Sequence, residues 1–192
     1  MAAPKKEMDK LEETIKKCTK CALHGKRLHA VPGEGSSKAA VFFIGEGPGA
    51  EEDKQGRPFV GRSGQFLREM IRTIGFKEED VFIGNVVKCR PPENRDPQPE
   101  EIEACYPYLQ KQLEIIQPKV IATLGRHSMA RFLPSQTISK CHGRIYKRKD
   151  GVYIFPLYHP AVALYSPSQK EILLKDMQRL PALLKYIQQE KG

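Results

Sequence analysis

Apolar residues recur along much of the chain at the three- and four-residue spacing that is typical of amphipathic helices. Ser63 stands just before one such stripe and is expected to cap the helix, which Gly75 ends. Pro99, followed by two glutamates, marks the start of a longer helix. Pro181 should bend or split the last helix. The predicted helices cover residues 5–17, 64–74, 99–116, 126–132 and 169–189.

Short, nearly continuous apolar runs separate these helical segments and are typical of buried strands. The last two runs are predicted to be hairpin arms joined around Asp150-Gly151. Because strands alternate with helices, the fold class is predicted to be α/β, with a mostly parallel sheet covered on both faces. The chain shows no internal repeat and no long linker, so residues 1–192 are expected to form one domain. The predicted strands cover residues 39–44, 81–87, 119–124, 144–148 and 152–157.

Composition narrows the class of protein. The 192 residues include 40% hydrophobic and 29% charged residues, and no apolar run is long enough to span a membrane. The first 17 residues lack the apolar core of a secretion signal, so we expect a cytoplasmic protein associated with the nucleoid. Lys plus Arg is 32 against 23 Asp plus Glu, a formal charge of +9 that favours a polyanionic partner such as nucleic acid. A basic but otherwise ordinary enzyme is the alternative.

The cysteine spacing indicates a metal centre rather than disulfides, because the chain is expected in a reducing compartment. Cys18 and Cys21 form a C-x-x-C pair that can bind one metal centre, and Cys89 and Cys105 could complete a four-thiolate site. Four thiolates suit tetrahedral zinc or an iron–sulphur cluster. Alternatively, the second pair consists of small buried apolar residues. Cys141 has no local partner and is interpreted as an ordinary thiol.

The loop after the first strand has an unusual composition. Residues 45–50, Gly-Glu-Gly-Pro-Gly-Ala, superficially match a dinucleotide-binding fingerprint. We reject that interpretation because the acidic residues 51–53 would repel a pyrophosphate and Pro48 lacks a backbone donor. The chain contains no Walker A sequence. The acidic residues suit water activation or metal binding instead, unless they only form an acidic surface turn.

Three further residues follow predicted strands or lie in loops, where the ligands of a parallel sheet bind. Phe59, between proline and glycine, could stack on a flat ligand, or could belong to the core. Asn85 could pair with the edge of a base through one donor and one acceptor, or could only form a turn. His159 could donate to a developing anion, although a lone histidine is more often structural.

Together these motifs resemble those of the family 4 uracil-DNA glycosylases, the iron–sulphur enzymes of archaea and bacteria. The resemblance runs from about Leu11 to Tyr186 and implies a three-layer α/β/α sandwich with a central, mostly parallel, four-stranded sheet. It also implies hydrolysis of the bond between uracil and deoxyribose in DNA, which leaves an abasic site. The motifs are Gly45-Glu-Gly-Pro-Gly with Glu52-Asp53, Gly56-Arg-Pro-Phe-Val-Gly61, Asn85-Val-Val-Lys-Cys-Arg-Pro-Pro-Glu-Asn-Arg95 and Tyr158-His-Pro160.

The resemblance also implies roles for individual residues. An extruded uracil would stack on Phe59 and pair with Asn85. His159 and backbone N–H groups of the turn that contains Gly45 and Gly47 would stabilise charge on uracil O2. Glu52 is the first candidate for positioning water and stabilising the cationic sugar, and Glu46 is the second. Glu46 could instead wall the pocket near uracil C5. Cys18, Cys21, Cys89 and Cys105 would hold a structural [4Fe–4S] cluster.

DNA contacts are expected at two basic segments and one apolar position. Arg90 and Arg95 lie in one loop, and Lys147 and Arg148 lie at the hairpin tip, where a solvated charged turn is the alternative. Leu164 or its neighbour Ala163 would enter the space left by the base. The expected partner is uracil-containing DNA, single- or double-stranded, with no membrane. We expect a monomer, and a sliding-clamp partner stays open because the sequence does not show one.

Three other interpretations remain open. A sister glycosylase class lacks an acidic residue in the first motif, and Glu46 and Glu52 argue against it. A relative that traps uracil covalently carries a basic loop with a histidine where this chain has Cys89-Arg-Pro-Pro. A non-catalytic iron–sulphur or zinc DNA-binding module, or a redox sensor, would need the cysteines and the positive charge. It would not need Phe59, Asn85 and His159 together.

Overall fold

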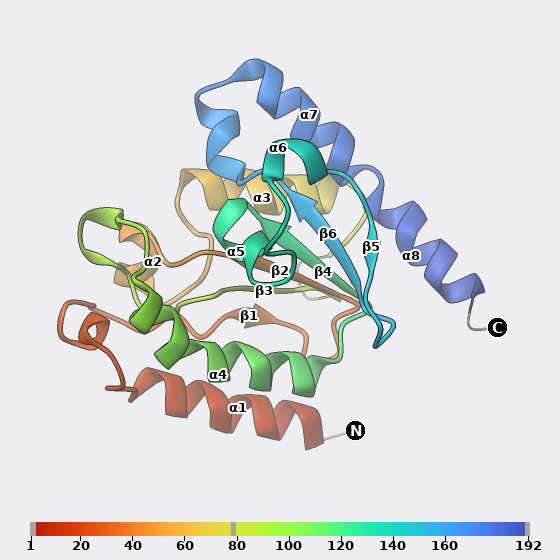
Figure 1. The fold of residues 1–192 in the computed structure, drawn as a ribbon. Helices are drawn as coiled ribbons and strands as arrows, with labels where there is room; N and C mark the ends of the chain where they lie inside the picture. Colours follow the sequence, from red (N-terminus) through yellow and green to blue (C-terminus); the bar gives the residue numbers. More distant parts are fainter. Residues whose placement is uncertain (1–2, 78–79, 191–192) are drawn as a thin grey trace.

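The fold is built on a six-stranded sheet, and the computed structural model describes residues 3–77 and 80–190 around it (Figure 1). The strand order is β1-β3-β2-β4-β6-β5, in which the inner four strands are parallel and the two edge strands pair antiparallel. The α/β class and the mostly parallel sheet are therefore confirmed. The strands are β1 Glu34–Gly35, β2 Val41–Gly45, β3 Phe82–Asn85, β4 Val120–Leu124, β5 Tyr146–Lys147 and β6 Tyr153–Leu157.

The expectation of four strands is wrong because the sheet carries two short edge strands. β5 was expected as a hairpin arm, and it pairs with β6 as predicted. β1 has only two residues and no apolar pattern, so periodicity could not reveal it. Gly35 in β1 has a φ of +128°, and a Cβ there would lie 2.0 Å from the Val81 carbonyl oxygen. This close approach of two backbones requires glycine.

Helices cover both faces of the sheet (Figure 1). Successive strand residues point to opposite sides, and the inner strands are buried throughout, so both faces need a covering layer. Phe42 of β2 belongs to the cluster on the side of two helices, and Phe43 belongs to the cluster on the side of three others. The first side carries α1 Ala3–Lys16 and α4 Pro99–Ile116. The second carries α3 Arg62–Thr73, α7 Pro167–Met177 and α8 Leu180–Gln189.

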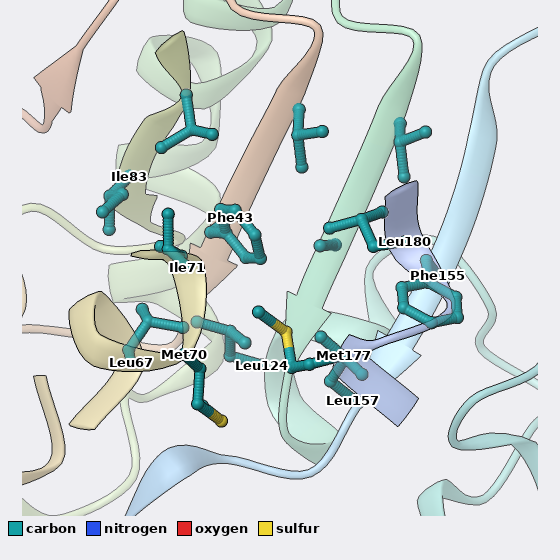
Figure 2. Close-up of a cluster of buried hydrophobic side chains, with 14 of the residues drawn as sticks. Phe43, Leu67, Met70, Ile71, Ile83, Leu124, Phe155, Leu157, Met177 and Leu180 are labelled. Atoms are coloured by element: carbon teal, nitrogen blue, oxygen red, sulfur yellow. The ribbon is translucent and has the colours of Figure 1, made fainter. Parts of the chain in front are cut away.

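The second cluster is the larger part of the core (Figure 2). Phe43 and Phe155 project from the sheet toward Met70, Met177 and Leu180 of the covering helices, and all five side chains are at most 1% exposed. Burying each such side chain contributes about 1.5–3 kcal/mol, so this layer fixes how the strands and helices lie relative to one another.

Several helix boundaries differ from the prediction. The segment expected to be a loop contains α2, Ala50–Gln55, whose first turn holds the acidic residues that a helix N-terminus stabilises. The next helix is capped by Gly61, so Ser63 lies inside it and is not the cap. The last helix divides into α7 and α8, with Pro181 in the first turn of α8, as the proline predicted. The remaining short helical segments are η1 Ala22–Gly25, η3 Pro92–Asn94, α5 Arg126–Ala130, α6 Ile138–Cys141 and η4 Pro160–Leu164.

None of the helices in the described part of the chain is long and apolar enough to cross a membrane. The loops that follow β2, β3 and β6 all leave the sheet at the carboxyl ends of parallel strands. The sheet therefore brings together three segments that lie far apart in the sequence, as expected for a ligand site in this class of fold.

Candidate active site

A cavity of about 410 Å³ opens at the carboxyl ends of these strands. Its size suits a small ligand or a single nucleobase. The side chains that line it come from the loops after β2, β3 and β6 and from the segment before α3. The lining includes Glu46, Glu52, Phe59, Asn85, Asp96 and His159.

Asn85 ends β3 and lines the cavity, with only 2% of its surface exposed. Its side-chain oxygen Oδ1 is buried and has no hydrogen-bond partner among the residues that the structure describes. A buried acceptor without a partner costs about 1–3 kcal/mol, so it is expected to be satisfied by a ligand. The alternative that Asn85 serves only to form a turn leaves this unpaired oxygen unexplained.

Gly45, opposite Asn85 in the parallel register, makes room for both the amide and the aromatic ring. A Cβ at Gly45 would lie 2.4 Å from Asn85 Oδ1 and 2.6 Å from Phe59 Cζ. Gly47 has a similar function farther along the loop, because a Cβ there would lie 2.8 Å from Val87 Cγ2. The glycines of the first motif therefore allow close packing at the cavity wall.

Phe59 has a positive φ of 51°, which an aromatic residue adopts only when its surroundings enforce it. Arg68 Nε donates to the Phe59 carbonyl at 3.0 Å, and Arg68 Nη2 donates to the Pro58 carbonyl at 2.8 Å. A Cβ at Gly64 would lie 2.1 Å from the Phe59 carbonyl carbon, so glycine is required there. The ring is 5% exposed, and thus both packs with the core and lines the cavity.

His159 caps η4 and lines the same cavity as Phe59, with the ring centroids 6.0 Å apart and the rings tilted by 34°. The Ala161 N–H donates to His159 Nδ1 at 3.2 Å, so the proton of the neutral ring is on Nε2. Burial lowers the pKa of His159 to about 4, and the nearby Glu52 carboxylate opposes this shift. The residue is therefore a neutral hydrogen-bond donor at neutral pH.

The Glu52 carboxylate is held by backbone groups. Its Oε1 accepts from the N–H groups of Val60 and Gly61 at 2.9 and 2.8 Å, and its Oε2 accepts from Gly49 at 3.1 Å. These bonds join the turn after β2 to the loop that carries Phe59. Glu52 thus orders two walls of the cavity, a function that the sequence did not predict.

Glu46 lines the same cavity near two polar residues that sequence reasoning missed. Its Oε2 lies 3.6 Å from His127 Nε2, and His127 Nε2 lies 3.2 Å from Asp96 Oδ2. Partial burial raises the pKa of Glu46, and His127 partly opposes the shift. His127 belongs to α5, and no local motif signals it, because only the sheet topology brings α5 beside the first motif.

The expected DNA contacts separate into two groups. Arg95 lines the cavity, but its guanidinium makes two bonds to Glu101, at 2.6 and 2.8 Å. Arg90 Nε donates to Asn94 at 2.8 Å in the same loop. Lys147 and Arg148 instead lie at the other end of the strands, because Lys147 pairs with the first residue of β6, and Lys147 also contacts Glu190. The structure therefore does not bring the hairpin tip to the cavity, and a DNA contact at Lys147 and Arg148 stays a prediction.

The segment after His159 contains an exposed aromatic residue, Tyr165, that sequence reasoning overlooked. Leu164 and its neighbour Ala163 are both half-buried, and Leu164 lines a groove beside Arg62 and Phe66 of α3. Tyr165, the next residue, is 84% exposed. It is the C-terminal cap residue of η4.

The four cysteines of the predicted metal site surround one small cavity between α1, the loop after it and α4. The Lys88 N–H donates to Cys105 Sγ at 3.2 Å, and Arg27 Nη1 donates to Cys89 Sγ at 2.9 Å. Such donors stabilise thiolates. Cys141 is elsewhere, fully buried with its sulfur 3.1 Å from Met129 Sδ, as expected for an ordinary thiol.

The spacing of the sulfur atoms can be compared with that of a tetrahedral zinc site. The sulfur atoms of a tetrahedral zinc site lie about 3.8 Å apart, because each Zn–S bond is about 2.3 Å. The ligand atoms of Cys, His, Asp and Glu can be compared over residues 3–77 and 80–190. There, the only group of three or more whose ligand atoms all lie within 4.8 Å of one another is Glu46, Asp96 and His127, which contains no cysteine. Within the described residues, no three of the four thiols therefore have the sulfur spacing of one tetrahedral zinc site.

Comparison with known proteins identifies the class to which this fold and cavity belong. Residues 32–181 match the family described as the Uracil DNA glycosylase superfamily, so the chain belongs to that superfamily. A type-4 uracil-DNA glycosylase of Sulfurisphaera tokodaii is 48% identical over 92% of this chain and 84% of its own length. One of Thermotoga maritima is 44% identical over 93% and 95%. A type-5 uracil-DNA glycosylase of Thermus thermophilus is only 30% identical over 67% and 68%.

Within the superfamily, the chain is a member of the type-4 uracil-DNA glycosylases. The predicted resemblance to this family is thereby confirmed.

The lowered pKa of His159 predicts a pH dependence of stability. The unfolded chain protonates this imidazole below about pH 6.5, whereas the folded chain does so only near pH 4. Its contribution to stability is therefore complete above the unfolded pKa and is lost as pH falls between these values. The expected loss is at most about 3 kcal/mol. In His159→Gln, the urea midpoint of unfolding should change less with pH across this window than in wild type. His24→Gln, at an exposed imidazole, should keep the wild-type dependence. An equal pH dependence of the midpoint in wild type and His159→Gln would contradict the assignment.

Proposed function

We propose that this protein removes uracil from DNA by hydrolysing the N-glycosidic bond, as the names of its type-4 relatives indicate for those proteins. The observation that carries the proposal is the unpartnered Oδ1 of Asn85, which is buried at a cavity of nucleobase size. Uracil presents an N3–H donor beside the O4 acceptor, which matches the oxygen and nitrogen of one amide. Cytosine presents the opposite pattern and would leave buried polar groups unpaired.

The target nucleotide must leave the duplex to reach this cavity. Phe59 supports the proposal because its ring is held at the cavity wall by the clamp from Arg68 and by the space at Gly64. A fixed aromatic face lets a base stack without an entropic cost for ordering the ring. The hydrogen bonds from Arg68 thus maintain the strained backbone at Phe59, and this backbone keeps the ring in a fixed orientation.

The departing base would carry negative charge on O2, and His159 would stabilise it. The support is its tautomer, because Nε2–H is the free donor once Nδ1 accepts from Ala161. No proton needs to move to the base in this step, since a neutral imidazole can donate a hydrogen bond. The bond between uracil N1 and the sugar carbon breaks with its electrons on uracil.

Water would then attack the sugar carbon, with Glu46 rather than Glu52 accepting its proton. Glu46 is a half-buried carboxylate at the cavity, and the interactions of its side chain are with His127 and neighbouring charges, not with backbone N–H groups. Both oxygens of Glu52 already accept backbone hydrogen bonds, so Glu52 orders the cavity wall and contributes negative charge to the cationic sugar. The second candidate from the sequence thereby becomes the first.

Cys18, Cys21, Cys89 and Cys105 would hold a [4Fe–4S] cluster, which the spacing of their sulfurs favours over zinc. When bound, the cluster supplies a covalent link between the N-terminal region, the segment after β3 and α4. Such a link couples binding to folding, because all four ligands come from elements that must come together first. The residues proposed for the reaction belong to a different cavity.

Excision from oligonucleotides tests the proposed function. We expect release of uracil from U·G, U·A and single-stranded substrates and no release from the matching cytosine oligonucleotides. Asn85→Ala should reduce the rate about 100-fold, because two hydrogen bonds of roughly 1.4 kcal/mol each are lost. A brown protein that binds DNA but releases no uracil would favour the non-catalytic module or sensor.

The exchange of roles between the two glutamates predicts distinct pH profiles. The single-turnover rate should fall as pH drops through the raised pKa of Glu46. Asp96 also raises this pKa, whereas His127 and Arg126 lower it. Glu46→Gln should lose about 10²- to 10⁴-fold in rate and should lose this acidic limb. Glu52→Gln keeps an acceptor for Val60 and Gly61 and should lose much less. If Glu52→Gln removed the limb and Glu46→Gln kept it, Glu52 would be the base.

The exposure of Tyr165 predicts which side chain fills the space of the flipped base. Tyr165→Ala should reduce excision from duplex DNA by about tenfold relative to single-stranded DNA, because only the duplex must be held open. Leu164→Ala, at the half-buried neighbour, should have a smaller selective effect. The same assays on both substrates make the comparison. A selective duplex loss in Leu164→Ala alone would return this role to Leu164.

A further inference from the structure

A buried lysine between the cavity and the cysteines has no part in the reaction proposed above. Lys88 is 1% exposed and lies three residues after Asn85 and one residue before Cys89. Within the described part of the chain, it is the only lysine classed as buried. Burying an ammonium group is costly unless its hydrogen bonds are replaced, so its partners indicate what it does.

All polar groups of Lys88 have partners. The ammonium Nζ donates to the Asn85 carbonyl oxygen at 2.7 Å and to Gln112 Oε1 at 2.6 Å. The backbone N–H donates to Cys105 Sγ at 3.2 Å, and the carbonyl accepts from the Val31 N–H at 2.7 Å. Both acceptors of the ammonium are neutral, so the group is placed for hydrogen bonding to them and not for an ion pair.

The Asn85 carbonyl lies at the end of β3. Asn85 is the last residue of β3 in register with β2, and backbone pairing continues past it, because the N–H groups of Val86 and Val87 donate to the Gly45 and Glu46 carbonyls at 2.9 and 3.0 Å. The amide of Asn85 has its Oδ1 unpartnered, so no protein hydrogen bond to that oxygen helps to orient the side chain. Its direction is set by the close approach of Gly45 and by the position of its own backbone.

The second partner of the ammonium fixes Lys88 from the opposite side. Gln112 lies two turns after Cys105 on α4, on the same helix face. Its Nε2 donates to the Pro32 carbonyl at 2.7 Å, so its Oε1 is held toward Lys88. One face of α4 therefore contacts the backbone of Lys88 through a cysteine and the side chain of Lys88 through an amide.

We propose that Lys88 is a positioning residue for base recognition, whose ammonium fixes the Asn85 carbonyl and thereby directs the Asn85 amide into the cavity. The inference rests on the proposed function, in which Asn85 pairs with uracil. It also gives the cysteine region a direct mechanical connection to the cavity, because Lys88 contacts Cys105 and Asn85 at once. Without the ammonium, the Asn85 carbonyl would lose this partner, whereas the bond from the Val86 N–H to the Gly45 carbonyl would remain.

The test uses the holoenzyme and the variants Lys88→Met, Asn85→Ala and the double variant. The readouts are the inhibition constant of free uracil, the single-turnover excision rate, the affinity for undamaged duplex and the visible absorbance per protein. Lys88→Met should raise the inhibition constant about tenfold or more and lower the rate by a similar factor. Its absorbance and its affinity for undamaged duplex should match wild type. The inhibition constant distinguishes positioning from mere destabilisation, because it does not depend on the fraction of protein that is folded.

The double variant measures the coupling. If Lys88 acts through Asn85, the double variant should be no weaker in uracil binding than Asn85→Ala alone. Lys111→Met removes a lysine from the exposed face of α4 beside Gln112 and serves as the matched control, with wild-type behaviour expected. An unchanged inhibition constant in Lys88→Met, or multiplying losses in the double variant, would overturn the inference.

A second variant applies if Lys88→Met does not fold. Gln112→Leu removes one of the two acceptors of the ammonium and should raise the inhibition constant about threefold. Combined with Asn85→Ala, it should cause no further loss of uracil binding. An unchanged inhibition constant in Gln112→Leu would overturn the inference. The failure of the proposed function is distinguishable, since it would appear as wild-type uracil binding and excision in Asn85→Ala itself. A defective Asn85→Ala beside a normal Lys88→Met would overturn only the role of Lys88.

Discussion

The cavity depends on the close approach of two parallel strands at Gly45 and Asn85. The register places the two residues opposite each other, and glycine leaves the space into which the Asn85 amide and the Phe59 ring fit. Any side chain at this position would overlap both groups. The glycine-rich loop thus has a different function from that of a phosphate-binding loop, in which glycines let backbone N–H groups approach an anion. Here they let uncharged side chains of other segments approach the strand end.

Most charged side chains around the cavity are bonded to backbone groups or to one another. Few ionisable side chains therefore remain for a reaction. Arg68 fixes the strained turn at Phe59, and Glu52 joins two loops through backbone N–H groups. Arg95 is paired with Glu101, and Asp53 is buried and accepts from the Leu28 N–H at 3.0 Å. Because charge-assisted bonds to backbone groups are stronger than neutral ones, they can hold irregular loops that lack a regular ladder. In the part of the chain that the structure describes, the ionisable groups left at the cavity are Glu46, Asp96 and His159, and His127 lies beside the first two.

Local patterns predicted the elements that carry their own signal. The central strands are short apolar runs, and the helix division at Pro181 follows from the missing N–H of proline. α2 was missed because glycines and acidic residues obscure a helix of only six residues, and β1 was missed because two residues have no period. Single residues of the candidate site, such as Asn85 and His159, could be selected because they end or follow apolar strands.

Side-chain partners, in contrast, could not be derived from local sequence. His127 lies beside Glu46 only because β4 is adjacent to β2 in the sheet, and the fold places α5 at the end of β4. The roles of Glu52 and Glu46 were ordered by motif position, whereas the difference between them is the number of backbone donors that each carboxylate faces. The same holds for Lys88, whose partner Gln112 lies 24 residues away on α4.

The segment from Asn85 to Cys89 shows how one strand end can serve two sites. Asn85 faces the cavity, Lys88 is tied to α4, and Cys89 faces the other three thiols, all within five residues. Because every polar group of Lys88 is bonded, this segment cannot slide along the sheet without breaking several buried hydrogen bonds at once. The order of the cysteine region and the position of Asn85 at the cavity are therefore mechanically linked, although the two cavities share no lining residue.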